Sequence, residues 1–556
     1  MRTRFAIFAD PLIVHERTKW LEDERGIDEM NDRNERGGSR NDAAQVEQPE
    51  LSGIALLEHT RARIEAGGGS AAVDKQHKRG KLTARERLDR LYDPGTFLEL
   101  GMFAKHRCEA LAGKDIPGDG VVVGRGEVHG RNVLAFAQDL TVAGGSLGER
   151  HAQKIVELCQ RALRCGAPVV GFNDSGGARI QEGVHSLSGY GRVFYFNTML
   201  SGVVPQISVV AGPCAGGAAY SPALTDFVIM IDQTAHMFIT GPTVIRAVTG
   251  EEITEEALGG ANVHASVSGN VHLVAHSEDD AIAKVKQLLS YLPSNNLQPP
   301  PELRFDEPLV DDTVFDDLLP EDPRKPYDMH LLIERIVDYG EFFEIQPTFA
   351  PNILVGFARI CGMVVGIVAN QPAVMAGTLD INASDKASRF IRTCNIYNVP
   401  LLTLVDVPGF LPGVDQEHGG IIRHGAKMLF AYGSASVPKV TLIVRKAYGG
   451  AYLAMCSKDM GADIVLAWPS AEIAVMGPEA AVRVLNRDLL NDPEALDEAI
   501  AEYRRTHANP YRAAESLHVD DVIRPAWTRR LVGQWIAANT DKRVLRPNKK
   551  HGNIPL

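Results

Sequence analysis

The feature that most constrains the fold of this chain is an internal repeat. Val123–Gly130 resembles Val355–Gly362, and Gly124 and Gly130 are displaced by the same number of positions from Gly356 and Gly362. The register continues over further pairs: Lys154 with Lys386, Pro168 with Pro400, Asp174 with Asp406 and, after one inserted residue, Pro205 with Pro438 and Gly216–Ala218 with Gly449–Ala451. A register held over roughly a hundred residues is typical of a duplicated unit. We therefore predict two copies of one domain in this 556-residue chain.

Each copy alternates short apolar runs with helical patterns. Runs rich in Val and Ile predict strands at Gly120–Val123, Pro168–Phe172 and Gln206–Ala211 in the first copy, and at Met363–Ala369, Pro400–Val405 and Val440–Val444 in the second. Helical periodicity lies at His151–Arg164 and Ser384–Tyr397. Continuous apolar strands that alternate with helices are typical of buried, mostly parallel sheets covered by helices. Each copy is therefore predicted to be an α/β domain.

The segment between the copies disfavours regular structure. Residues 293–326 hold eight prolines and nine acidic residues, and proline interrupts both helices and central strands. Residues 1–50 hold 12 acidic and 8 basic residues with few bulky apolar ones after Leu21, a mixture typical of disorder. The predicted organisation is a tail at 1–50, an N-terminal domain at 51–292, a linker at 293–326 and a C-terminal domain at 327–556.

Composition and charge exclude several classes of protein. The 58 Lys and Arg against 70 Asp and Glu give a net charge of −12, so no chain-wide positive field would attract nucleic acid. The most apolar stretch, Ile360–Ala369, has about half the length of a membrane-spanning helix. The seven cysteines are scattered without a Cys-x-x-Cys pair, and no signal or transit pattern precedes the domains. We expect a cytoplasmic protein with neither nucleic acid nor membrane as partner.

A glycine pair follows an apolar strand in both copies. Val204–Tyr220 runs from a strand through Gly216 and Gly217 into a helical stretch, and Val437–Tyr452 repeats this order. Glycines at a strand-to-helix turn leave backbone N–H groups open to a ligand oxygen, and the helix dipole favours negative charge there. The pattern indicates an oxyanion hole in each copy. Tight packing of the turn against its helix is the alternative.

A second signature is a glycine-rich, charged loop after a strand. Asn173–Gly183 carries it in the first copy and Val405–Gly425 in the second. Open α/β sheets bind ligands at the carboxyl ends of their strands, so both loops are candidate binding segments; plain surface turns are the alternative.

These motifs resemble one family. The segments that carry the resemblance are Ser175–Gly183, Leu379–Lys386, Asp406–Gly413, Arg445–Tyr452 and Ala467–Gly477. Together they are similar to the carboxyltransferase subunit of biotin-dependent acyl-CoA carboxylases, over roughly residues 55–556. Asp415–Lys427 is most similar to propionyl-CoA carboxylase β chains and methylmalonyl-CoA carboxyltransferase. The zinc ribbon of many bacterial acetyl-CoA carboxylase β subunits is absent.

The resemblance implies two tandem crotonase-like (ClpP/crotonase) spiral domains, with acyl-CoA on the N-terminal domain and carboxybiotin on the C-terminal one. Gly216 and Gly217 would hold the thioester oxygen as it becomes an enolate, and Gly450 and Ala451 the ureido oxygen of biotin. Propionyl-CoA is the substrate favoured by the resemblance; a transcarboxylase or decarboxylase acting on methylmalonyl-CoA, and a carboxyltransferase for acetyl-CoA or another acyl-CoA, are the alternatives. The family's shared sites imply a homohexamer.

Further residues are expected to contact substrate. Ala218, Tyr448 and Gly449 adjoin the glycine turns, and Leu453 matches the family position near the acyl group, where propionyl-type members usually carry aspartate. Packing within the helix is the alternative for Leu453. CoA phosphates need cationic partners. Arg179 is one candidate, and a basic run is the other: Lys75, His77, Lys78, Arg79, Lys81, Arg85 and Arg87.

The chain lacks other machinery. It has no Gly-x-x-x-x-Gly-Lys-[Ser/Thr] loop for ATP, no Ala-Met-Lys-Met biotinylation site and no clustered metal-ligand motif. Biotin is therefore expected in trans, on a biotin carboxylase and carrier subunit, and no metal is expected. A CoA hydratase or isomerase would need a glutamate pair near the first turn, and Gly216–Ser221 offers none. A non-catalytic scaffold is the remaining alternative, against which both intact turns count.

Overall fold

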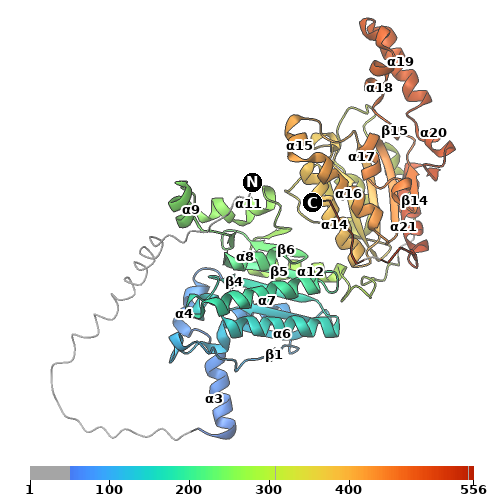
Figure 1. The fold of residues 1–556 in the computed structure, drawn as a ribbon. Helices are drawn as coiled ribbons and strands as arrows, with labels where there is room; N and C mark the ends of the chain where they lie inside the picture. The colour runs from blue at the N-terminus through green and yellow to red at the C-terminus, as the bar shows by residue number, and fades with distance from the viewer. Residues whose placement is uncertain (1–50, 307–308, 549, 556) are drawn as a thin grey trace, which may run out of the picture. The chain divides into compact units, whose positions relative to one another are not determined.

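The computed structural model describes residues 51–306, 309–548 and 550–555; the predicted tail at 1–50 lies outside them. Residues from Thr60 onward form one compact unit. Within it lie two sheets of eight strands, one in each copy (Figure 1). In each sheet a long central strand leads into the predicted glycine turn. Strands alternate with helices in both copies, so the α/β class predicted for each is confirmed.

The first sheet has the order β1-β2-β3-β4-β5-β6-β8, with β7 paired to β5. Its strands are β1 (Leu98–Leu100), β2 (Val121–Val128), β3 (Arg131–Gln138), β4 (Val169–Ser175), β5 (Gln206–Ala215), β6 (Phe227–Ile231), β7 (His236–Phe238) and β8 (Leu273–Ala275). From β3 to β8 all pairings are parallel. The predicted strands are present, and several extend further toward the carboxyl edge.

The second sheet repeats this order as β9-β10-β11-β12-β13-β14-β16, with β15 paired to β13. Its strands are β9 (Phe342–Glu344), β10 (Ile353–Ile360), β11 (Met363–Asn370), β12 (Leu401–Val407), β13 (Lys439–Tyr448), β14 (Ile464–Ala467), β15 (Glu472–Ala474) and β16 (Asp521–Val522). Residues of β12 are buried throughout, as expected for a strand with both faces covered.

Both sheets start with antiparallel strands, which the expectation of mostly parallel sheets did not include. β2 and β3 are joined by His129 and Gly130, with φ of 51° and 69°, and β10 and β11 by Cys361 and Gly362, with φ of 56° and 79°. Two consecutive left-handed residues form the two-residue turn that matches the twist of a hairpin. The first repeat motif found in the sequence is therefore this hairpin.

Each copy also contributes helices, several of which pack against its sheet. In the first copy they are α3 (Gly53–Glu65), α4 (Ser70–His77), α5 (Ala84–Leu91), α6 (Glu149–Cys165), α7 (Val184–Leu200), α8 (Gly217–Ala223), α9 (Pro242–Thr249), α10 (Glu255–Gly259), α11 (Ala261–Ser266) and α12 (Glu278–Tyr291). In the second they are α13 (His330–Ile336), α14 (Ile381–Ile396), α15 (Val414–Gly419), α16 (Ile421–Ser434), α17 (Gly449–Ala454), α18 (Pro478–Leu485), α19 (Pro493–Thr506), α20 (Pro510–Glu515) and α21 (Thr528–Ala538). Figure 1 shows α6 beside α7, and α14 beside α16, at corresponding places.

Between the copies, the described part of 293–326 holds one short 3₁₀ helix at Thr313–Asp317. The two copies contact each other directly. The Tyr397 hydroxyl donates to the Asp226 carboxylate at 2.6 Å, Arg389 donates to the Thr225 carbonyl at 2.8 Å, and the Phe227 and Phe357 rings lie 6.1 Å apart. Apolar residues of both copies form one continuous core. The domain boundaries stay a prediction.

Candidate active site

The first glycine turn lies where β5 passes into α8. Gly216 has φ of 59°, in the left-handed region, and its N–H donates to the Phe238 carbonyl of β7 at 3.0 Å. Gly217 and Ala218 are the first two residues of α8. Amides at these positions have no acceptor within their own helix. The Gly217 and Ala218 amides at the first turn therefore have no acceptor within α8.

The second turn has the same construction at the junction of β13 and α17. Gly449 has φ of 58°, and β15 pairs with β13 as β7 pairs with β5. A Cβ built on Gly450 would meet no atom within 4 Å. A side chain at Gly450 would therefore have room.

The matched geometry corrects one prediction. Gly216 corresponds to Gly449 by conformation and by its place at the strand end, so Gly217 corresponds to Gly450 and Ala218 to Ala451. Because the Gly216 amide is already bonded within the sheet, Gly216 does not belong to the donor pair. The equivalent pairs are Gly217 with Ala218 and Gly450 with Ala451.

An aromatic ring supports the first turn. A Cβ on Gly217 would lie 3.1 Å from the ring of Tyr190, a residue of α7. Tyr190 is buried, and burial raises the pKa of its hydroxyl, so it stays a neutral phenol. The sequence analysis missed Tyr190, because no local pattern marks a ring that packs under a turn from a distant helix.

Buried ion pairs lie beneath both turns, at the strand ends that the repeat aligns. Asp174 accepts from Lys81 at 2.8 Å and from Arg87 at 2.9 Å, and Asp406 accepts from Arg445 at 2.9 Å. Arg87 also bonds Glu278 at 2.7 Å. Burial lowers the pKa of Lys81 and raises that of Asp406, which Arg445 opposes.

The basic run proposed for CoA phosphates therefore contains both buried, ion-paired residues and exposed cations. Lys81 and Arg87 are buried in ion pairs and cannot reach a phosphate, which corrects that part of the prediction. Arg85 bonds Glu99 at 2.6 Å and His77 approaches Glu86 at 3.0 Å. Exposed cations of the run are Lys75, Lys78 and Arg79, at the end of α4 and just after it.

Arg179 is also placed differently from expectation. Its side chain is 2% exposed and bonds Asp119, Glu182 at 2.8 Å and the Ser146 carbonyl at 2.9 Å. All these acceptors belong to the protein, so the guanidinium braces the loop after β4 and does not face a ligand. The Asn173–Gly183 signature is thus partly structural.

Tyr448 and Leu453 differ in exposure. Tyr448 is 7% exposed and its hydroxyl donates to the Glu472 carboxylate, whose other oxygen accepts from Arg504 at 2.9 Å. Tyr448 therefore supports the second turn instead of contacting substrate as predicted. Leu453 is 41% exposed, one turn into α17. Glu472 lies within the Ala467–Gly477 segment that carries the family resemblance, whereas Arg504 had no recognisable signal in the sequence.

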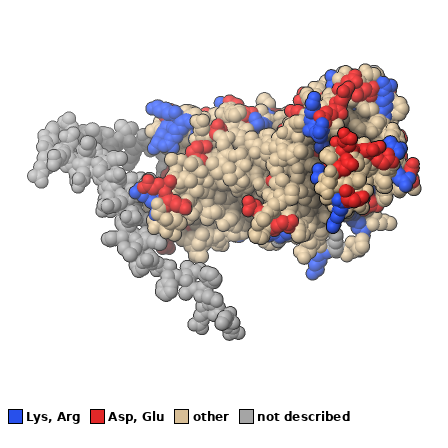
Figure 2. All heavy atoms as spheres, turned by 90° about the horizontal axis from the view of Figure 1, so that it is seen from above, with Lys and Arg blue, Asp and Glu red and all other residues tan. Residues whose placement is uncertain are grey.

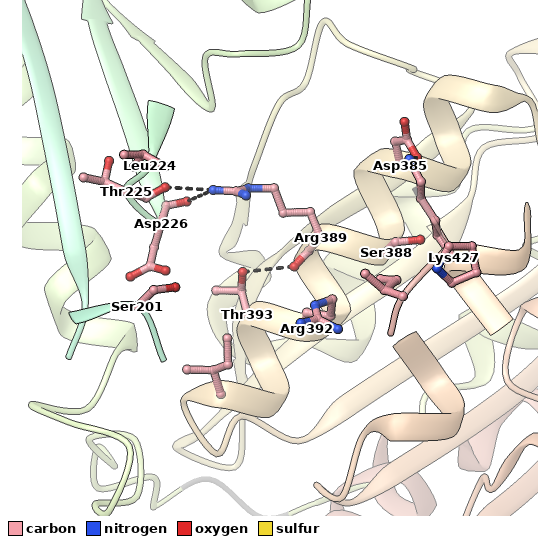
Figure 3. Close-up of a pocket in the computed structure, with 13 residues that line it drawn as sticks. Ser201, Leu224, Thr225, Asp226, Asp385, Ser388, Arg389, Arg392, Thr393 and Lys427 are labelled. Carbon is pink, nitrogen blue, oxygen red and sulfur yellow. Dashed lines mark hydrogen bonds and ion pairs between the residues drawn. The ribbon is translucent and has the colours of Figure 1, made fainter. Parts of the chain in front are cut away.

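The junction between the copies contains a separate cavity of about 350 Å³ (Figure 3). One face of α14 supplies Arg389 and Arg392, and Thr225 and Asp226 lie opposite them. Its lining includes no residue of either glycine turn. Arg389 spans from α14 to the Thr225 carbonyl, so this cavity belongs to the contact between copies.

Among residues 51–306, 309–548 and 550–555, no cluster of three or more His, Cys, Asp or Glu is arranged to hold a metal ion. Within the same ranges, no helix is long and apolar enough to cross a bilayer.

Comparison with known proteins places this geometry in a family. Residues 75–554 match the model of the carboxyl transferase domain. The chain is 57% identical over 506 residues to the methylmalonyl-CoA decarboxylase subunit alpha of Veillonella parvula, covering 90% of this chain and 99% of that protein. It is 55% identical over 507 residues to the propionyl-CoA carboxylase carboxyltransferase subunit of Haloferax mediterranei, covering 90% and 98%.

A solved structure agrees with these relatives. The transcarboxylase 12S structure, described as a hexamer assembly with methylmalonyl-coenzyme A and methylmalonic acid bound, has a TM-score of 0.89 at 53% identity and covers 91% of this chain and 99% of that chain. These matches, over two α/β halves that each carry a glycine turn, define an acyl-CoA carboxyltransferase of the biotin-dependent class. The chain belongs to the carboxyl transferase domain family, and the expected tandem crotonase-like fold is confirmed by the structural match.

Proposed function

We propose that this chain transfers a carboxyl group from carboxybiotin to the α-carbon of propionyl-CoA, giving methylmalonyl-CoA. The observation that carries the proposal is the pair of equivalent turns, each opening a helix with two amides that lack an intrahelical acceptor. Relatives named for propionyl-CoA and methylmalonyl-CoA at 52–57% identity support the substrate.

The chain's own backbone amides stabilise the negative charge that develops during the reaction. As the α-proton of the acyl-CoA leaves, the thioester oxygen becomes an enolate oxygen, and the Gly217 and Ala218 amides stabilise it. Such preorganised donors are worth about 2.7–4 kcal/mol each in the transition state. Carboxybiotin, when bound, would supply CO2 by cleavage of its N–carboxyl bond; the freed ureido nitrogen would take up the α-proton, and the enolate α-carbon would form the new bond to the CO2 carbon. The mechanism needs no side-chain base from the chain.

The second turn fits a cyclic urea oxygen. Gly450 faces open space, and the start of α17 favours negative charge because of the helix dipole. The Gly450 and Ala451 amides would hold the ureido oxygen and stabilise the charge that develops on it. Biotin is proposed to arrive on a carrier domain of a partner subunit that also holds the biotin carboxylase.

We propose a homohexamer core, with each site shared between the first copy of one chain and the second copy of another. The transcarboxylase 12S relative is described as a hexamer. An apolar stripe along α7 supports contact between chains: Val184, Leu187 and Tyr195 are 70%, 64% and 59% exposed. On the face drawn in Figure 2, charged side chains gather toward the two ends and the middle is largely uncharged.

The test is a substitution at Gly450. Gly450→Val places a branched side chain in the open space before the second turn, where the fold has room for it. We expect kcat for carboxyl transfer to free biotin to fall about 10²–10³-fold, with thermal stability and assembly unchanged. Gly433→Val, at an exposed helical glycine of α16, is the matched control. Unchanged transfer in the Gly450 variant would refute the proposal.

A second candidate function is that of a decarboxylase or transcarboxylase subunit acting on methylmalonyl-CoA. It is favoured by the relatives named methylmalonyl-CoA decarboxylase and methylmalonyl-CoA carboxyltransferase, at 57% and 55% identity. Incubation of the wild-type protein with carboxybiotin and acetyl-, propionyl- or methylcrotonyl-CoA measures the acyl preference. Turnover with acetyl-CoA or methylcrotonyl-CoA and none with propionyl-CoA would reject the proposed substrate.

A further inference from the structure

The two glycine turns also correspond in the side chains that follow their amide donors. Three residues after Gly217 comes Tyr220, and three residues after Gly450 comes Leu453. Tyr220 is 51% exposed and Leu453 41%, while the residues that follow them, Ser221 and Ala454, are buried. Each helix therefore presents one large exposed side chain at the same position relative to its amide donors.

Helical geometry places Tyr220 beside the first donor pair. Residues i and i+3 share a helix face, so Tyr220 lies on the face of α8 that starts with Gly217. Side chains on a helix lean toward its N-terminus. The phenol ring is thus directed toward the space in front of the Gly217 and Ala218 amides.

Neighbouring rings fix this orientation. Phe194 of α7 meets the Tyr220 ring edge-on at 6.1 Å, and Tyr190, whose ring packs against Gly217, lies 5.7 Å from Phe194. Three aromatic side chains therefore form a row beside the first turn. Only the last of them is exposed: Tyr190 is 4% and Tyr220 51% exposed.

The chemistry identifies the ligand for this ring. With the thioester oxygen on the amides, the reacting ureido nitrogen must come within about 3–3.5 Å of the acyl α-carbon. The bicyclic ring of biotin must then lie directly in front of the first turn. A flat, half-exposed aromatic face suits a compact ring system, and aromatic contacts add affinity beyond buried area.

Resting on the proposed function, we propose that Tyr220 forms one wall of the biotin site, packing its ring against the bicyclic ring while Gly217 and Ala218 hold the thioester oxygen. Tyr220 is then a specificity residue for biotin that the first, acyl-CoA-binding copy contributes. The phenol hydroxyl is not required, since the contact is made by the ring face.

The experiment separates the two substrates of the full-length protein. Steady-state carboxyl transfer between methylmalonyl-CoA and free biotin is measured for wild type, Tyr220→Phe and Tyr220→Leu, the last copying Leu453 of the other turn. We expect the KM for biotin to rise about tenfold in Tyr220→Leu and to stay within about twofold in Tyr220→Phe, with the KM for the acyl-CoA unchanged in both. A purely structural role would alter both constants together.

Tyr511→Leu is the matched control, because Tyr511 is a similarly exposed tyrosine on α20 of the other copy. A Tyr220→Leu variant that raises only the KM for the acyl-CoA, or neither KM, overturns the inference. If the wild type itself transfers no carboxyl group to biotin, the proposed function fails instead, so the two failures are distinguishable.

Discussion

At the scale of single residues, the repeat preserves two buried lysines. Lys154 donates to the Gly118 carbonyl at 2.8 Å, and Lys386 to the Phe349 carbonyl at 2.8 Å. Burial lowers the pKa of both ammonium groups to about 8. Each lysine satisfies carbonyls of a loop beside its hairpin, which accounts for its occurrence at the same displacement as the glycines. A role in the fold explains this pair without a role in catalysis.

His330 gives a prediction for pH. Glu344 at 3.1 Å and Asp328 at 2.7 Å raise the pKa of its imidazole to about 9. Because this is above the ordinary value near 6.5, the charged histidine stabilises the folded state fully below pH 6.5, and this contribution is lost as pH rises through 9. We expect His330→Gln to lower Tm at pH 6 and to approach the wild-type Tm by pH 9.5.

Thermal unfolding of both proteins at pH 6, 8 and 9.5 measures this difference. A gap in Tm that stays constant over the series would contradict the assignment of charge to His330, since the hydrogen bonds of a neutral imidazole do not vary with pH in this range.

How far the sequence predicts the site is clearest at the first turn. The repeat identified both glycine turns, because glycine is the residue that tolerates the left-handed φ at the strand end. The repeat could not show which backbone amides of the turn lack a hydrogen-bond acceptor. Gly216 loses its amide to Phe238 in β7, a pairing between segments separated in sequence. Arg179 and Lys81 were misassigned for the same reason, since Asp119, which pairs with Arg179, and Asp174, which pairs with Lys81, lie elsewhere in the chain.

At the scale of elements, the two hairpins allow the same glycine substitution to be compared in two different surroundings. Gly130 and Gly362 have φ of 69° and 79°, and their N–H groups bond Asp93 at 2.8 Å and Asp338 at 2.7 Å. A Cβ on Gly130 meets nothing within 4 Å, whereas one on Gly362 lies 1.9 Å from the Leu303 carbonyl oxygen. The two turn glycines therefore share a left-handed conformation and an aspartate acceptor but differ in the space around a Cβ.

We expect Gly130→Ala to lower the free energy of unfolding by about 1–2 kcal/mol, the cost of a left-handed alanine. Gly362→Ala should cost at least about 1 kcal/mol more because of the clash. Urea unfolding of the two variants measures the difference, and equal losses would show that the Leu303 segment moves aside freely.

The second turn is held from a distant helix. Arg504 of α19 bonds Glu472 of β15 and Glu479 of α18, each at 2.9 Å, and Glu472 holds the Tyr448 hydroxyl beside Gly449. The first turn has no such tyrosine, since Ala215 stands at the equivalent place. We infer that Arg504 positions the second turn.

We expect Arg504→Gln to lower kcat with free biotin about tenfold through misplacement of the turn, with the KM for the acyl-CoA unchanged and partial recovery in Arg504→Lys. Arg505→Gln is the control, because Arg505 is exposed and pairs with Glu502 on its own helix. Equal rates in the Arg504 and Arg505 variants would remove α19 from the mechanism.

Element types were more predictable than pairings. Apolar runs located the central strands because both faces of these strands are buried. The antiparallel hairpins were missed, although His129-Gly130 and Cys361-Gly362 supply the glycine that such turns require. In each turn only the second residue is glycine. The first, His129 or Cys361, also adopts a left-handed φ, and nothing in the sequence indicated this.

At the scale of the whole molecule, duplication explains why one chain carries two equivalent glycine turns. Both copies share a continuous core, and Tyr397 and Arg389 join them through hydrogen bonds to Asp226 and Thr225. The apolar stripe on α7 stays exposed on the single chain. The sequence could not reveal this stripe, because exposure depends on tertiary packing.

Leu187 tests the assembly. Leu187→Asp introduces a charge in the middle of the exposed α7 stripe, where Val184 and Tyr195 are its neighbours. Burying an unpaired carboxylate between chains is strongly unfavourable, whereas on an isolated chain the aspartate would be solvated. We therefore expect the variant to fold with an unchanged circular dichroism spectrum and to elute as smaller species. Because the proposed shared site needs two chains, carboxyl transfer should fall with the loss of assembly and recover at high protein concentration. Leu297→Asp, at a leucine 88% exposed in the inter-copy segment, should change neither property. Full assembly of the Leu187 variant would show that α7 faces solvent.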